Sequence, residues 1–439
     1  MGSSLNALPE WGGVGRKCGE EILLASLRRL AWGIFPEKPS NHIEQNWMKK
    51  NLTMREILVV GLMSWVGLTG VRGGEEEGFG SLFNGKDLTG WDGRPGLWAV
   101  NEGAIRGETT ATNRAPGNTF LIWRGGILKD FDLRLSYRIL TGNNSGVQYR
   151  SRVEGGWVVK GYQGEVVNQL GKTGFLYDEG RRGWLTDVGD FMEISGDGKM
   201  EVVGVVANQK AMGGVPYHVD KGWNSYRIVC RGNFVEQYVN GYPTVELIDK
   251  QVDGDGEKSL KASRLSGVLA LQIHGGGAMT VDFKEIRLKN YGDKFGVARR
   301  IFNGVDLGGW KGEVGKWAVG AMEEGTDTGR RTKTVGVLGV MRCVGGGEGG
   351  LIFSEAVGEN YDFRFQRRRG GEIKTGGDGA IKMVMGWVSG EVEVRGGKVV
   401  SYRLNGEKSA EKSPVVGGVI TLGSGAAVEY RNLVVIPIE

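Results

Sequence analysis

The chain has 439 residues, too many for one hydrophobic core, which predicts two domains with additional segments. Its 79 glycines follow no Gly-X-Y period, which excludes collagen, and they separate short alternating runs rich in Val, Leu, Tyr and Trp. The formal charge is +5, of which residues 48–73 supply three (four Lys or Arg against one Glu), so no long basic stripe for nucleic-acid binding remains.

An apolar run at residues 57–68 follows Lys49, Lys50 and Arg55 and is typical of a secretory signal peptide, here residues 48–73. It is too short to span a membrane comfortably, so we expect no stable span after cleavage and an exported protein, periplasmic or extracellular. Because an export signal belongs at the N-terminus, residues 1–47 are predicted to be a non-native extension. The alternative is an uncleaved anchor with a short cytoplasmic tail.

The sequence also aligns with itself. Residues 82–91 (LFNGKDLTGW) match 301–310 (IFNGVDLGGW), and Trp98 and Trp317 each follow seven residues after these segments. Later motifs repeat in the same order, which predicts two related modules, about 78–290 and 299–438. Three cysteines lie far apart and indicate neither a disulfide framework nor a metal knuckle.

Within each module the hydrophobic period is two. In residues 131–139 large apolar side chains alternate with polar ones, as in a strand with one buried face. Asn-Gly pairs at 84–85, 240–241, 303–304 and 405–406 predict hairpin turns. Without long amphipathic helices after the signal, the modules are predicted to be all-β antiparallel sandwiches.

Strand alternation brings polar side chains onto the open face of the first module. The residues that point together on three strands are Gln148, Arg150 and Arg152; Gln163 and Glu165; and Gln272 and His274. These residue types bind sugars, so the face is a candidate saccharide site. The alternative is an ordinary solvated sheet face, of which Arg134 and Arg138 on a neighbouring strand are examples.

An ordered series of motifs carries a family resemblance: FNGKDLTGW, NNSGVQYRSR, GYQGE, LYDEGRRG, WNSYRI, VNG and LQIHGG. It resembles the 3-keto-disaccharide hydrolase domain family and covers essentially all of residues 78–290. The resemblance implies a concanavalin A-like jelly roll in an exported bacterial protein. Residues 299–438 retain only the scaffold motifs and are predicted to be a shorter, degenerate jelly-roll copy with a structural or targeting role.

The family implies a substrate whose C3 hydroxyl is already a ketone, so that a base removes the C2 proton, the C1 group leaves and water adds. We expect Glu165 and His274 to be base and acid, in an order left open. The expected substrate-binding residues are Gln148, Arg150, Gln163, Glu179, Arg181 and Gln272. The charged segment 177–183 has the alternative of a turn with internal ion pairs.

The resemblance favours an enzyme, a hydrolase or lyase acting on 3-keto-glycosidic bonds, with a saccharide as its partner. The competing class is a non-catalytic carbohydrate-binding or cell-surface module, since fold does not fix activity. Residues 253–257 resemble a calcium loop but lack its closing residues, and His218 is expected to be solvated. A divalent cation, structural or catalytic, stays possible with no ligands assigned, and no oligomeric state is indicated.

Overall fold

The computed structural model describes residues 78–142, 144–207, 217–251, 265–321, 339–344, 350–369, 387–411, 413–416, 419–422 and 428–439. The predicted extension, the signal peptide and the 253–257 turn lie outside these residues. The described part is strand and loop, apart from the 3-10 turn η1 (Val314–Lys316). None of its helices is long and apolar enough to cross a membrane.

The first module consists of two sheets, named here after a central strand. The order of the described strands in the β6 sheet is β12-β11-β15-β14-β13-β6-β17-β4-β3, with β1 beside β17. Their bounds are β1 (Gly80–Ser81), β3 (Trp98–Asn101), β4 (Ala104–Thr109), β6 (Asp130–Thr141), β11 (Asp190–Ile194), β12 (Met200–Val205), β13 (Asn224–Arg231), β14 (Phe234–Val239), β15 (Tyr242–Asp249) and β17 (Met279–Gly292). The pairs are antiparallel except β11 with β15.

The β7 sheet faces it, in the order β10-β9-β8-β7-β16-β5-β2. Its strands are β2 (Trp91–Asp92), β5 (Thr119–Trp123), β7 (Asn144–Gly155), β8 (Val158–Val167), β9 (Leu176–Glu179), β10 (Gly183–Thr186) and β16 (Val268–Ile273). The alternation predicted for 131–139 is confirmed, because Phe131, Leu133 and Leu135 are buried in the core that joins the two sheets.

The second module also has two described sheets, the β23 sheet (β20-β21-β29-β23-β24-β25-β26, with β18 beside β29) and the β22 sheet (β19-β22-β28-β27). The strands are β18 (Arg299–Arg300), β19 (Trp310–Gly312), β20 (Trp317–Ala321), β21 (Gly339–Cys343), β22 (Leu351–Phe353), β23 (Tyr361–Arg369), β24 (Val388–Arg395), β25 (Lys398–Leu404), β26 (Glu407–Lys408), β27 (Val415–Val416), β28 (Val419–Leu422) and β29 (Val428–Pro437). The all-β prediction with two antiparallel jelly-roll sandwiches is confirmed, whereas the sequence-based module boundaries stay predictions.

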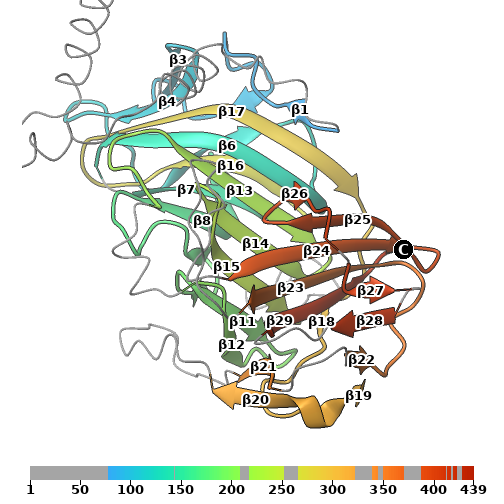
Figure 1. Cartoon of the computed structure of the whole chain (residues 1–439). Helices are drawn as coiled ribbons and strands as arrows, with labels where there is room; N and C mark the ends of the chain where they lie inside the picture. The colour runs from blue at the N-terminus through green and yellow to red at the C-terminus, as the bar shows by residue number, and fades with distance from the viewer. Residues whose placement is uncertain are drawn as a thin grey trace, which may run out of the picture. The chain divides into compact units, whose positions relative to one another are not determined.

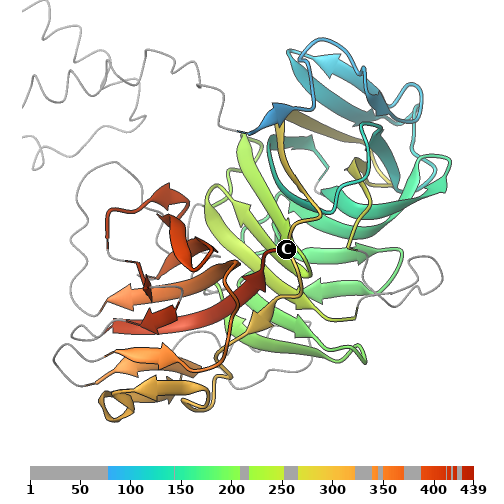
Figure 2. The same ribbon diagram turned by 90° about the vertical axis from the view of Figure 1, so that its right-hand side faces the viewer.

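The C-terminal strand β29 joins the modules. Its side chains alternate between two cores: Val434 and Ile436 pack with the first module, whereas Leu433 and Val435 pack with the second. Residues 75–439 accordingly form one compact unit. Both ribbon views show the orange and red strands of the second module beside the green strands β11–β15 (Figures 1 and 2).

The Asn-Gly pairs divide into two kinds of turn. Asn240 and Asn405 have positive φ, as do the glycines that follow them, and they close hairpins as predicted. The prediction is wrong for residues 84–85 and 303–304, which precede strands that pair elsewhere. There the Asn84 side chain accepts the N–H groups of Lys86 and Asp87, so the asparagine side chain closes the turn.

The same turn forms at Asn303, whose side chain accepts the N–H groups of Val305 and Asp306. The indole that follows is held in the same way in both modules: Trp91 donates to Leu82 O at 2.8 Å and Trp310 to Ile301 O at 3.2 Å.

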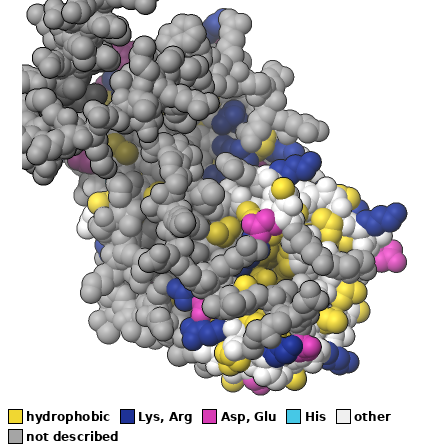
Figure 3. Space-filling view, in the orientation of Figure 1, with side chains coloured by type: hydrophobic (Ala, Val, Ile, Leu, Met, Phe, Trp, Pro, Cys, Tyr) yellow, Lys and Arg dark blue, Asp and Glu magenta, His cyan; other side chains and the backbone are white. Residues whose placement is uncertain are grey.

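On the face shown in Figure 3, Lys and Arg side chains lie in separate groups with acidic side chains among them.

Candidate functional site

Four polar side chains form a hydrogen-bonded chain on the outer face of the β7 sheet. Gln148 Nε2 donates to Gln163 Oε1 at 2.8 Å, and Gln163 Nε2 donates to Glu165 Oε2 at 2.7 Å. Asn144 Nδ2 donates to the other oxygen, Glu165 Oε1. We call Asn144, Gln148, Gln163 and Glu165 the amide relay. Ser151 Oγ fixes its far end by donating to Gln148 Oε1 at 2.6 Å.

Strand register explains why these residues meet. Gln148 lies directly opposite Gln163, and Gly146 lies opposite Glu165. A Cβ at Gly146 would lie 2.4 Å from the Gln163 side chain, so the relay needs a residue without a side chain there. The spacing 144, 146, 148 places Asn144 on this face. Strand alternation could therefore have predicted Asn144 on this face, but the site predicted from the sequence did not include it.

Glu165 is the one ionisable side chain of the relay. Burial raises its pKa to about 7, and the charge of Glu179 acts in the same direction, while the hydrogen bonds from Gln163 and Asn144 oppose the shift. A carboxyl group that titrates near neutral pH exchanges a proton with substrate more readily than an ordinary surface glutamate does.

Gln272 lies on the neighbouring strand β16 at the level of Gly146. Its backbone carbonyl accepts Ser145 Oγ at 2.7 Å, which fixes the strand there. The side chain is fully buried, yet neither amide atom has a hydrogen-bond partner among the described residues. A buried amide without partners is unfavourable, and a substrate hydroxyl or carbonyl would satisfy it.

His274 and Glu179 lie at the edge of this face. His274 follows the end of β16, is exposed, and donates its Nδ1 hydrogen to Gly275 O at 2.7 Å, which leaves Nε2 as an acceptor in the neutral ring. Asn118 links the two segments, accepting Gly275 N at 2.9 Å and donating to Glu179 Oε1 at 3.1 Å. Asn118 precedes its strand, so alternation gave no signal for it.

The β7–β8 hairpin bends over the same face and gives it an apolar side. Trp157 O accepts the Phe120 N–H at 2.9 Å, and Trp157 Nε1 donates to Asp92 Oδ1 at 2.7 Å. Val153, Trp157 and Val159 pack there on an apolar cluster of β5 and β16. The face thus presents an apolar wall beside the relay, as saccharide sites commonly do.

The structure contradicts the prediction that Arg150 binds substrate. The β7–β8 register shifts between Tyr149 and Arg152, and Arg150 has φ 47°. This bulge turns Arg150 away from Gln148. Its guanidinium is buried and binds Lys129 O at 2.6 Å and Asp130 Oδ1 at 3.2 Å. Asp130 in turn accepts backbone N–H groups, including that of Gly232, so this pair is structural. Arg152 is exposed and pairs with Glu154.

The 177–183 segment divides between the two faces. Asp178 accepts Arg182 Nε at 2.6 Å, Arg182 also pairs with Asp249 at 2.8 Å, and Arg181 Nε lies 3.8 Å from Asp178. These are the internal ion pairs of the structural alternative, and Arg181 is not brought to Glu165. Tyr177, directly opposite Gln163, and Glu179, directly opposite Gly161, lie on the face of the relay, and the charges of Glu179 and Glu165 add to the burial that raises the pKa of Tyr177.

The prediction that His218 is solvated is also wrong. Its side chain is buried beside the Tyr137 hydroxyl, and burial lowers the pKa of His218. Among the described residues no group of three or more His, Cys, Asp or Glu side chains is arranged to hold a metal ion.

Residues 78–289 match the model of the 3-keto-alpha-glucoside-1,2-lyase-like domain. These residues belong to that domain family. No curated protein sequence matches the chain. Two proposed glycosyl hydrolases of Parabacteroides distasonis are similar to it, one 17% identical over 48% of this chain and 98% of its own, the other 20% identical over 49% and 95%, both with a TM-score of 0.33. A carbohydrate-binding module from Bacillus subtilis is 14% identical over 47% and 98%, with a TM-score of 0.30. The match identifies the first module as a carbohydrate-related domain.

Proposed function

We propose that the first module cleaves 3-keto-glycosides, with Glu165 as the base. The observation that carries the proposal is the state of this carboxyl group: buried, with its pKa raised to about 7, and held by two side-chain amides. Neutral amide donors orient a carboxylate without supplying a full opposite charge. The carboxylate therefore stays basic enough to accept a carbon-bound proton that an adjacent ketone has acidified.

The reaction has two stages. Glu165 takes the C2 proton, the electron pair forms an enolate with the C3 ketone, and the C1–O bond then breaks to give an enone and the free aglycone. Water next adds across the double bond: the protonated Glu165 returns its proton to C2, the hydroxyl joins C1, and His274 Nε2, neutral after the first stage, accepts the water proton, which regenerates a 3-keto sugar and both side chains. The Gln272 amide would stabilise substrate oxygens, and in the first stage His274 acts as the protonated ring, which keeps Nδ1–H on Gly275 O and donates from Nε2 the proton that the leaving oxygen needs.

Replacing Glu165 by Gln tests the proposal, with p-nitrophenyl 3-keto-α-glucoside and ordinary p-nitrophenyl glucoside as substrates. We expect the variant to lose about 10³-fold in kcat and His274→Ala to lose about 10²-fold. Glu193→Gln is the control, because Glu193 pairs with Lys250 on the other sheet. Since the base must be ionised, wild-type kcat/KM should fall as pH drops below about 7.

Full activity in Glu165→Gln would reject this site. Saturable binding of both glycosides without turnover would instead identify a carbohydrate-binding module. Parallel assays with a chelator show whether a divalent cation takes part.

We further propose that the protein is exported after cleavage of residues 48–73 and that the second module is a degenerate copy of the first. The twin asparagine turns and their tryptophans support the duplication. Mass spectrometry of the exported protein tests the first part. A mature chain that begins near Met1 would contradict it.

A further inference from the structure

Three polar atoms beside Glu165 have no hydrogen-bond partner among the described residues. They are Asn144 Oδ1 and both amide atoms of Gln272, Nε2 and Oε1. All three are shielded from water, and the Gln272 side chain is fully buried. A buried polar group that makes no hydrogen bond is unfavourable by about 1–3 kcal/mol, and in native proteins such a group often marks a catalytic or binding role.

The side chains that carry these atoms flank one glycine of the β7 sheet. Gly146 lies directly opposite Glu165 on one side. On the other side, Ser145 Oγ donates to Gln272 O, which fixes Gln272 at the level of Gly146. Asn144 precedes Gly146 by two residues and therefore shares its face. Two strand spacings, about 10 Å, separate the backbones of Glu165 and Gln272, which is the width of a sugar ring with its hydroxyl groups.

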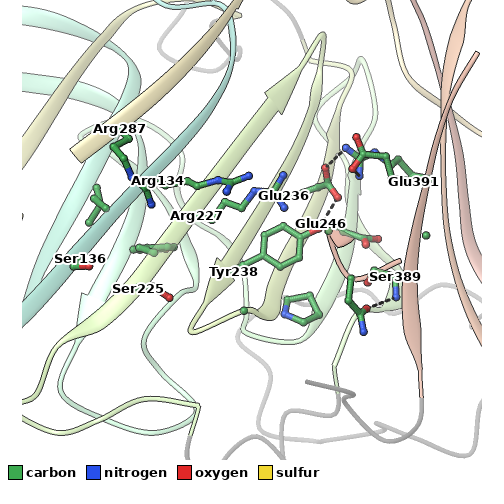
Figure 4. A pocket seen from close by; sticks show the side chains of 18 of the residues that line it. Arg134, Ser136, Ser225, Arg227, Glu236, Tyr238, Glu246, Arg287, Ser389 and Glu391 are labelled. Atoms are coloured by element: carbon green, nitrogen blue, oxygen red, sulfur yellow. Dashed lines mark hydrogen bonds and ion pairs between the residues drawn. The ribbon is translucent and has the colours of Figure 1, made fainter. Parts of the chain in front are cut away.

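The pocket in Figure 4 shows how differently polar groups are arranged on the other sheet. This pocket of about 460 Å³ lies between the β6 sheet and the second module. Glu236 accepts the Tyr238 hydroxyl at 2.7 Å and pairs with Arg364 at 3.3 Å, while Arg364 also pairs with Glu391 at 2.9 Å. These charged groups are paired with one another, whereas the amides beside Glu165 keep hydrogen-bonding atoms for a ligand.

The amide of Asn144 has a defined orientation. A carboxylate only accepts hydrogen bonds, so the atom that contacts Glu165 Oε1 is the amide nitrogen of Asn144. Its Oδ1 is therefore an acceptor held next to the base. Gln272 offers both a donor, Nε2, and an acceptor, Oε1. A substrate thus meets one acceptor beside the base and a donor with an acceptor two strands away.

We propose that these atoms select substrates with a free C2 hydroxyl, whose hydrogen Asn144 Oδ1 accepts. The inference rests on the proposed function, in which Glu165 takes the C2 proton. That proton and the C2 hydroxyl are on the same carbon, so the hydroxyl lies next to the base, where Asn144 is held. Gln272 Nε2 donates to the C3 oxygen, which becomes negative as the enolate forms, and Oε1 accepts the C4 hydroxyl.

Three p-nitrophenyl 3-keto-α-glucosides test the inference: the parent, its 2-deoxy analogue and its 2-deoxy-2-fluoro analogue. Each has an acidified C2 proton, but neither analogue can donate a hydrogen bond to Asn144 Oδ1. The fluoro analogue keeps an electron-withdrawing atom at C2, and hydroxide-catalysed elimination rates correct for the remaining differences in reactivity. We expect wild-type kcat/KM to be about tenfold lower for both analogues than for the parent.

Asn144→Leu keeps the size of the side chain and should treat the three glycosides alike within about twofold. Gln163→Leu is the matched control, because it removes the other amide donor to Glu165 and leaves the Asn144 acceptor in place. Its rates should fall, but the tenfold preference should stay. The preference is a ratio measured within one variant, so changes in the basicity of Glu165 or in the folded fraction cancel.

Equal wild-type rates for the three glycosides, or a preference that survives in Asn144→Leu, would overturn the inference and leave the proposed function intact. If no glycoside is turned over, the proposed chemistry fails, and calorimetric affinities replace the rates. About tenfold tighter binding of the parent that is lost in Asn144→Leu would then still support the inference. Equal affinities, or no binding of any of the three, would reject it.

Discussion

The two outer faces of the first module both carry buried polar side chains, yet they shift the pKa of a buried carboxyl group in opposite directions. On the β7 sheet, Glu165 is held by amides and burial raises its pKa to about 7. On the β6 sheet, burial alone would raise the pKa of Asp132, but the charges and hydrogen bonds of Arg227 and Arg134 outweigh it and lower the pKa. Burial is similar for the two groups, so the neighbouring charges decide.

This difference separates reactivity from structure. A carboxylate that is desolvated without a full opposite charge is costly to keep ionised and therefore ready to accept a proton. A carboxylate surrounded by guanidinium groups stays ionised and holds strands and modules together. The first arrangement suits chemistry, and the second suits assembly.

The largest effect is expected where opposite charges are most concentrated. Arg231 pairs with Glu236, Asp362 and Glu391 at 2.9, 3.1 and 3.2 Å, and it is buried between the modules. Arg231→Met leaves buried carboxylates short of one positive charge and should lower the free energy of unfolding by about 3–5 kcal/mol. Urea denaturation measures it, with Arg138→Met as the half-exposed control. A loss below about 1 kcal/mol would contradict the assembly role of this face.

Replacing Arg150 tests whether this residue at the bulge stabilises the fold rather than binding substrate. Arg150→Met removes the partner of Asp130 and should cost about 3 kcal/mol of stability. KM for the 3-keto-glycoside should stay within about twofold of wild type, because Arg150 does not reach the relay. A tenfold rise in KM with unchanged stability would show instead that Arg150 binds substrate.

Glu165 should also be visible in the pH dependence of stability. Its pKa is about 7 in the folded chain and near 4.5 when unfolded, so unfolding releases a proton between these values. Stability therefore falls as pH rises through this window, by at most roughly 3 kcal/mol for this group. Urea midpoints at pH 4.5 and pH 8 should differ less in Glu165→Gln than in wild type. Identical pH dependence in both would show that Glu165 is not perturbed.

Much of this comparison follows from the sequence. Alternation placed Gln148, Gln163, Glu165 and Gln272 on one face, because a regular strand repeats every two residues. It failed for Arg150, where a bulge shifts the register. It also took Arg134 as a solvated side chain, whereas Arg134 pairs with Asp132, which it shares with Arg227 from a strand about 90 residues further along the chain. Local pattern predicts which face a residue takes, but not which distant charges meet it there.

The smallest expected effect tests how the relay works. Gln163→Leu removes a donor to Glu165, and that hydrogen bond lowers the pKa of Glu165. The pKa should therefore rise, and the acidic limb of the kcat/KM profile should move to higher pH by about one unit, with kcat reduced roughly tenfold.

A merely structural role for Gln163 would lower stability and leave this limb in place. Gln237→Leu is the matched control, since Gln237 is a buried glutamine that accepts the Tyr226 hydroxyl in the core, away from the relay. Its loss should reduce stability without moving the pH profile. If Gln163→Leu behaves in the same way, the amides only fill space, and the distinction between the two faces reduces to their charges alone.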